Sequence, residues 1–129
     1  MKFNKASAVL LTIMCALVIP FSAQAGTAGA GEWDKLGTYT YIYSSNPVYS
    51  GGGDFRVCLS SKSNFSVTLH LYEDDAGDNQ DDYVGANYFS PGECYNFNNI
   101  GKYVDGDNNK AEFFVFDYSG KYVTVTFYD

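Results

Sequence analysis

Apolar and polar residues alternate in short segments along most of the chain, a pattern typical of β-strands with one buried face. In segment 65–71 every second residue is apolar, and the residues between them are Ser, Thr and His. Related patterns predict strands at 38–44, 55–59, 83–89, 94–97, 111–117 and 121–128. No segment of ten or more residues shows the 3.6-residue period of an amphipathic helix, so the pattern predicts an all-β fold.

The segments between these strands are rich in turn-forming residues. Segment 44–54, which reads SSNPVYSGGGD, contains Pro47 and three glycines, and we expect it to be a loop. The short link DYSG at 117–120 predicts a hairpin that joins the last two strands. Seven or eight strands at this spacing predict a small antiparallel β-sandwich of the Greek-key type.

The first 25 residues have the pattern of a signal peptide. Lys2 and Lys5 precede an apolar run at 6–22, and Ala23 and Ala25 are the small residues that a signal peptidase requires. The run is too short for a stable membrane anchor, and no later segment is apolar enough to span a bilayer. We therefore expect cleavage after Ala25 and a secreted, extracellular domain at 26–129, monomeric, with a flexible start at 26–36.

Charge limits the partners of that domain. The chain has eight basic and fifteen acidic residues. Cleavage of the signal peptide would remove Lys2 and Lys5, which leaves six basic and fifteen acidic residues and a formal charge of −9. Nucleic acids and anionic lipids require a basic surface, so we do not expect them as direct partners. Multivalent cations and cationic partners are compatible with this charge.

Two cysteines, Cys58 and Cys94, remain in the exported domain. An even number of cysteines in a small secreted domain predicts a disulfide. It would close a loop of about 36 residues, which the chain-entropy model values at about 4 kcal/mol. We interpret the pair as structural and not as a thiol nucleophile or metal ligand.

The sequence lacks the usual signs of an enzyme. His70 is the sole histidine and is expected on the solvent face of a strand, and no serine lies in a nucleophile-elbow motif. A zinc site would need a second histidine or free thiols. We therefore expect a non-enzymatic protein.

Tyrosines alternate with other residues in the first predicted strand. Tyr39, Tyr41 and Tyr43 could place three rings on one sheet face, where they would stack on sugars. The same rings could equally pack against the second sheet, and the sequence leaves both alternatives open.

The densest cluster of charge is segment 73–82, which has six carboxylates in ten positions and no Lys or Arg. It is either a solvated turn or a cation site, because calcium binds six to eight oxygen ligands, mainly carboxylates and carbonyls. The unrelieved repulsion among the acids favours the cation site, although the spacing is not that of an EF-hand. The candidate calcium ligands are Glu73, Asp75, Asp78, Asp81 and Asp82, with Asp105, Asp107 and Asn109 as possible additional ligands from a second loop.

Two local resemblances accompany this interpretation. The strand VTLHLY runs into Glu73 and Asp75, and Asp82 precedes the next strand, which resembles the third calcium loop of C2 domains over 65–89. That resemblance implies calcium ligation by these acids, and loaded loops that bind membrane head groups. Segment 90–116 resembles a βγ-crystallin Greek key but lacks the hydroxyl ligands of that family at 108–112. Both resemblances imply an antiparallel β-sandwich.

The sequence thus predicts a secreted binding module with a calcium site in an acidic loop. Its target would be a cell-envelope component, a glycan or another extracellular protein. The alternative is a small secreted effector, either an antimicrobial protein or an inhibitor of a peptidase or hydrolase. In that alternative the loop at 44–54 makes the contact, and the acidic segment is only a solvated turn.

Overall fold

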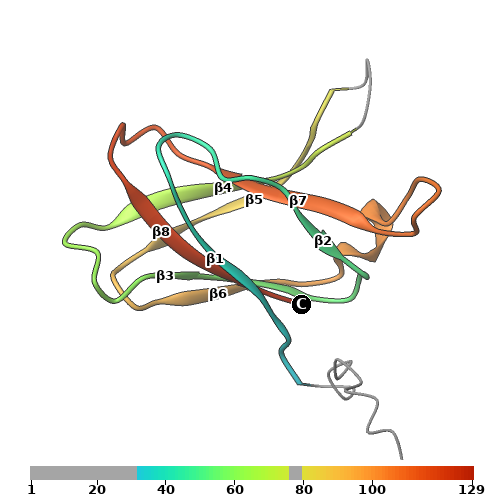
Figure 1. Cartoon of the computed structure of the whole chain (residues 1–129), viewed down its shortest axis with the longest axis horizontal. Coiled ribbons are helices and arrows are strands. Elements are labelled where there is room, and N and C mark those ends of the chain that lie inside the picture. The colour runs from blue at the N-terminus through green and yellow to red at the C-terminus, as the bar shows by residue number, and fades with distance from the viewer. Residues whose placement is uncertain (1–31, 76–79) are drawn as a thin grey trace, which may run out of the picture.

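The chain folds as two packed β-sheets, as a computed structural model shows for residues 32–75 and 80–129 (Figure 1). The predicted signal peptide at 1–25 lies outside these residues, as does most of the segment expected to be flexible. Within the described ranges, helical structure is limited to one short 3-10 helix. The all-β prediction is therefore confirmed.

Eight strands make up the fold, in agreement with the predicted seven or eight. The elements, in chain order, are β1 (Lys35–Tyr41), β2 (Val48–Ser50), β3 (Phe55–Leu59), β4 (Val67–Glu73), β5 (Asp82–Phe89), β6 (Cys94–Phe97), the 3-10 helix η1 (Ile100–Tyr103), β7 (Ala111–Phe116) and β8 (Val123–Tyr128).

The strands form two antiparallel four-stranded sheets with the orders β1-β8-β3-β6 and β2-β7-β4-β5. Only β4 and β5 are neighbours both in sequence and in their sheet, and every other connection passes from one sheet to the other. The hairpin predicted at 117–120 is therefore wrong. This segment is an arch between β7 and β8, which pair with different strands: β7 with β2 and β4, and β8 with β1 and β3.

The core lies between the sheets and is filled by the inward residue of each alternating pair. Phe55 is fully buried and packs on Phe113 of the facing sheet, with ring centroids 4.9 Å apart, and on Phe127 beside it at 5.6 Å. Burial of such side chains contributes about 1.5–3 kcal/mol each. This burial is what holds the two sheets face to face.

One strand was not predicted, and several strand boundaries differ from the prediction by two or three residues. Segment 44–54 contains the short strand β2, because the backbone of Val48 to Ser50 pairs with β7 after Pro47 has ended the preceding loop. β1 begins at Lys35, inside the segment expected to be flexible, and Asp34 already exchanges two backbone hydrogen bonds with Asp129, at 2.9 and 3.0 Å. Pairing with β8 therefore orders the chain from residue 34 onward.

The predicted disulfide is present. Cys58 on β3 and Cys94 on β6 are register partners in adjacent antiparallel strands and are covalently joined. Both lie on the outer side of the sheet, so the bond ties two strands without occupying the core. Among residues 32–75 and 80–129 there is no helix with the length and hydrophobicity needed to cross a membrane.

Candidate metal centre

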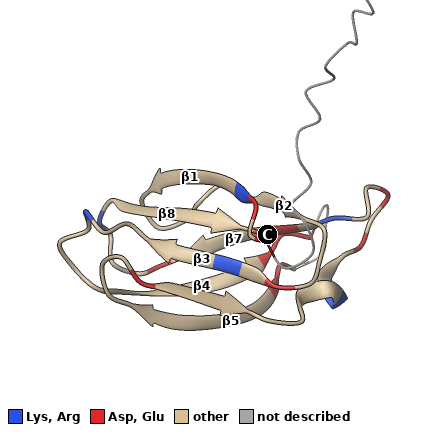
Figure 2. Cartoon of the chain, turned by 90° about the horizontal axis from the view of Figure 1, so that it is seen from below, with Lys and Arg blue, Asp and Glu red and all other residues tan. Residues whose placement is uncertain are grey.

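Acidic residues gather toward the end of the sandwich where the loop between η1 and β7 projects (Figure 2). The centre of this region is Glu73, the last residue of β4. Because residues two apart in a strand share a face, the alternation that buries Leu69 and Leu71 also turns Glu73 inward. Glu73 is 1% exposed and is the largest charged side chain among the fully buried ones that the structure describes.

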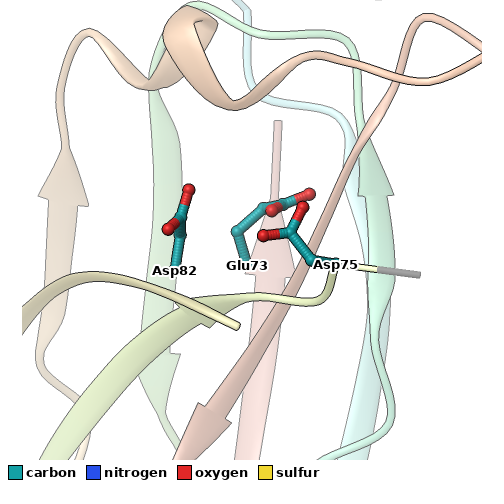
Figure 3. A group of neighbouring side chains, drawn as sticks. All are labelled: Glu73, Asp75 and Asp82. Carbon is teal, nitrogen blue, oxygen red and sulfur yellow. The ribbon is translucent and has the colours of Figure 1, made fainter. Parts of the chain in front are cut away.

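Two further carboxylates lie near Glu73, one from β5 and one from the end of β4. Asp82 begins β5 and is the register partner of Glu73, so the two side chains lie beside each other. Asp75 follows β4 by two residues, and its carboxylate and that of Glu73 point toward one another (Figure 3). One oxygen from each of Glu73, Asp75 and Asp82 lies within 4.8 Å of the other two.

A second group of carboxylates also includes Glu73 and lies on the β7 side of β4. Asp105 and Glu112 each place an oxygen within 4.8 Å of Glu73 and of one another. The loop between them is closed by an antiparallel bridge between Asp105 and Lys110, and Gly106 and Asn109 adopt the left-handed backbone that its turns need. This tight closure returns Asp105 to the start of β7, next to Glu112.

The hydrogen bonding of Glu73 is incomplete. Its Oε1 accepts the backbone N–H of Glu112 at 3.4 Å, a long hydrogen bond. Its Oε2 is buried and has no hydrogen-bond partner among residues 32–75 and 80–129. A buried carboxylate oxygen without a partner is costly, and either a proton on the carboxyl group or a bound cation would lower that cost.

Electrostatics agree with that geometry. Burial, followed by the charges of Asp105, Asp75 and Glu112, raises the pKa of Glu73 to about 7, against the lowering effect of the Glu112 N–H. The pKa of Asp75 is also raised, by desolvation and then by Asp82 and Asp105. Both shifts are in the direction expected when burial and neighbouring negative charges disfavour the ionised carboxylate.

Of the ligands predicted from the sequence, Glu73, Asp75 and Asp82 come together in one group, and Asp105 lies near Glu73 in the other. Asp81 is not in either group. It lies beside Asp74, and burial followed by the charge of Asp81 raises the pKa of Asp74. Asp107 is exposed in the loop after η1, outside both groups. Asp78 falls outside the described residues.

Sequence reasoning missed Glu112. Its position next to the acidic loop at 105–109 was visible, but its proximity to Glu73 depends on the pairing of β7 with β4, which places Phe113 opposite Glu73. No periodicity in the sequence specifies that pairing. The backbone N–H of Asp74 extends the same ladder, donating to the Glu112 carbonyl at 2.7 Å.

The tyrosines of the first strand do not form an exposed row. Tyr41 is buried, and Tyr39 packs on Phe127 with ring centroids 5.7 Å apart. β1 ends at Tyr41, and Tyr43 is exposed beyond it with a left-handed φ of 70°. Tyr39 and Tyr41 lie on the inward face of β1, whereas Thr38 and Thr40 lie on its solvent face. The rings of Tyr39 and Tyr41 thus pack against the core, whereas Tyr43 does not.

The fold and its acidic end define a small all-β sandwich with a candidate carboxylate metal centre. Residues 28–127 match the family described as "YndA coiled coil domain", and the chain belongs to that family. It is similar to "Uncharacterized protein YndA" of Bacillus subtilis (strain 168), with 71% identity over an alignment of 132 residues that covers 100% of both chains. No solved structure matches the chain. Because the described residues contain no α-helix, a coiled coil is not part of their fold.

Proposed function

We propose that this protein is a secreted, non-enzymatic binding module in which a calcium ion organises the acidic end of the sandwich. The ion would bind the carboxylates of Glu73, Asp75 and Asp82. Asp105 and Glu112, on the other side of Glu73, would add negative charge and help to hold the cation. The ordered loops would then present a surface to a cell-envelope component, a glycan or another extracellular protein.

The observation that supports this proposal best is the buried, unpartnered Oε2 of Glu73. A strand residue that needed only to fill space here would be apolar, because burial of a lone carboxylate is costly. With four other carboxylates beside it, Glu73 would also suffer repulsion in the absence of a cation. A bound cation removes both costs at once.

The donor set favours calcium over other metals. All five side chains offer oxygen, and neither group contains the histidine or free cysteine that zinc prefers. Calcium accepts carboxylates in flexible geometry at 2.3–2.6 Å, whereas magnesium needs a nearly ideal octahedron. Oxygens now within 4.8 Å of one another are close enough to surround one calcium ion after small adjustments.

Export is the second part of the proposal, and it rests on the basic and apolar pattern of the first 25 residues. Extracellular calcium falls in the affinity range of exported calcium modules. The expected N-terminus of the protein recovered from culture medium is Gly26, which N-terminal sequencing can establish. Recovery of the uncleaved chain from cells alone would contradict this part.

Thermal unfolding tests the calcium site directly. The thermal midpoint of the purified protein is measured in EDTA, in millimolar Mg²⁺ and in millimolar Ca²⁺. At a calcium concentration one hundred times its dissociation constant, the ion should add about 2.7 kcal/mol to the free energy of unfolding. That gain corresponds to a rise of several degrees in a domain of this size.

Matched variants separate a specific site from general charge screening. Asp75→Asn and Asp82→Asn should abolish the calcium-dependent rise, whereas Asp107→Asn removes the same charge from an exposed loop residue and should leave the rise unchanged. No rise in the parent protein, or an equal response in all three variants, would contradict the site. The small effector with a solvated acidic turn would then be the better interpretation.

A further inference from the structure

A second concave site lies on the outer face of the β2-β7-β4-β5 sheet, away from the buried carboxylate of Glu73. It is a shallow hollow of about 260 Å³. Its lining comprises four aromatic side chains and one carboxylate: Tyr72, Asp81, Phe114, Phe116 and Tyr118. No Lys or Arg is among these lining residues. Phe114 and Phe116 are half-buried on the solvent side of the sheet, and apolar residues gathered at such a hollow are a candidate binding surface.

Strand register places these rings together. Tyr72 on β4 is the direct partner of Phe114 on β7, and Phe116 follows two residues later on the same face. The rings of Tyr72 and Phe114 are almost parallel, 17° apart, with centroids separated by 5.6 Å. Tyr118, in the arch after β7, stands across Phe116 at 80° and 4.8 Å. Rings in two orientations therefore bound the hollow.

Asp81 supplies the charge of the hollow. It immediately precedes β5 and is exposed, so its carboxylate can meet a ligand from solvent. Aromatic faces carry negative potential and attract cations, and a carboxylate adds to that attraction. The lining is thus complementary to a positive group that also has apolar surface.

We propose that this hollow binds an alkylammonium group, with the cation over the aromatic faces and its charge balanced by Asp81. A quaternary head group fits best, because it is weakly hydrated and gives up water for ring faces more readily than a primary ammonium group or a small metal ion does. The volume suits a small head group, since it lies below the range of sites for drug-sized ligands. The hollow shares no residue with either carboxylate group, so the proposal does not require a bound calcium ion.

Two other ligand classes fit less well. Calcium requires six or more oxygens, whereas the hollow offers one carboxylate and two phenol groups. A sugar would stack on the rings, but its many hydroxyls need several placed hydrogen-bonding groups, which the hollow does not supply. A neutral apolar ligand would gain nothing from the Asp81 carboxylate, which stays hydrated at the exposed edge of the hollow.

Titration with choline, followed by NMR of the backbone amides of the full chain, tests the proposal. EDTA and constant ionic strength exclude effects from the metal centre. We expect saturable shifts at Tyr72, Phe114 and Phe116, with a dissociation constant in about the millimolar range. The neutral isostere dimethylbutanol, in which carbon replaces the choline nitrogen, should bind more weakly. A short lysine peptide shows by comparison whether a small molecule or a protein side chain is the better source of the ammonium group.

Variants identify the groups responsible. Asp81→Asn and Phe114→Leu should each raise the choline dissociation constant about two- to thirtyfold. Tyr122→Leu, a change at another exposed tyrosine on the β8 side of the arch, should leave it unchanged. Equal binding of choline and its neutral isostere, no saturable shift, or saturation by methyl glucoside in place of choline would overturn the proposal. Asp81 is exposed, so Asp81→Asn remains informative even if Phe114→Leu fails to fold.

Discussion

The hydroxyl of Ser50 donates a hydrogen bond to Oδ1 of Asp129 at 2.6 Å, and this contact joins the two sheets of the sandwich. Ser50 ends β2 in one sheet, while Asp129 follows β8 in the other. The second oxygen of Asp129 accepts the N–H of Gly51 at 2.9 Å. Because Ser50 is fully buried, its hydroxyl depends on this carboxylate for a hydrogen-bond acceptor.

Ser50→Ala is expected to lower the free energy of unfolding by about 1.5–3 kcal/mol, the usual worth of a hydrogen bond to a charged group. Urea unfolding measures this loss. Ser61→Ala, in the exposed turn after β3, is the matched control and should change stability by less than about 0.5 kcal/mol. An equal loss in both variants would show that the link between the sheets adds nothing.

The raised pKa of Glu73 predicts an unusual pH dependence. Burial raises this pKa from 4.5 to about 7, so between these values the folded chain keeps a proton that the unfolded chain has released. In EDTA the free energy of unfolding should therefore fall as the pH rises from 4.5 to about 7. The loss should be on the order of 3 kcal/mol. Urea unfolding at several pH values measures it.

Glu73→Gln provides the control for this pH dependence. The amide cannot ionise, so the variant should lose most of the fall in the free energy of unfolding with rising pH. Asp74 and Asp75 also have raised pKa values, so they should maintain a smaller fall of the same sign. Saturating calcium should reduce the decline in the parent protein, because a cation favours the ionised carboxylate. An unchanged decline in Glu73→Gln would assign it to other groups.

Glu112 provides a test that the sequence alone did not suggest. Its carboxylate lies beside Glu73 and Asp105 but outside the group proposed to bind calcium directly. Glu112→Gln should weaken calcium binding by roughly tenfold, which is typical of groups that support metal ligands. Isothermal titration calorimetry measures the change, with Asp107→Asn as the exposed control. Equal affinities in the two variants would remove Glu112 from the site.

Alternation within strands predicted much of the fold, because burial on one face imposes a period of two. It could not predict β2, where three residues form a strand only because β7 lies beside them. It also could not distinguish an arch from a hairpin at 117–120. Val115 and Val123 point inward in either case, and the difference lies in which strand each backbone pairs with.

The candidate site was predictable in composition but not in geometry. The unrelieved charge of segment 73–82 indicated Glu73, Asp75 and Asp82. The pattern placed Glu73 at the end of a strand but did not predict its burial, whereas β4 continues through Glu73 and carries its side chain into the interior. The burial and the unpartnered oxygen that distinguish a site from a turn follow from that extension, which depends on pairing with β5 and β7.

The disulfide should stabilise the protein mainly by restricting the unfolded chain. The two cysteines are 36 residues apart, so the chain-entropy model assigns the bond about 4 kcal/mol. Because the bond lies outside the core, Cys58→Ser/Cys94→Ser should keep the β-sheet circular dichroism spectrum while its urea midpoint falls. Reductant should lower the parent midpoint to a similar value and leave the variant unchanged. A variant that unfolds in the absence of urea would show that the bond is required for folding. An unchanged urea midpoint would contradict the predicted stabilisation by the disulfide.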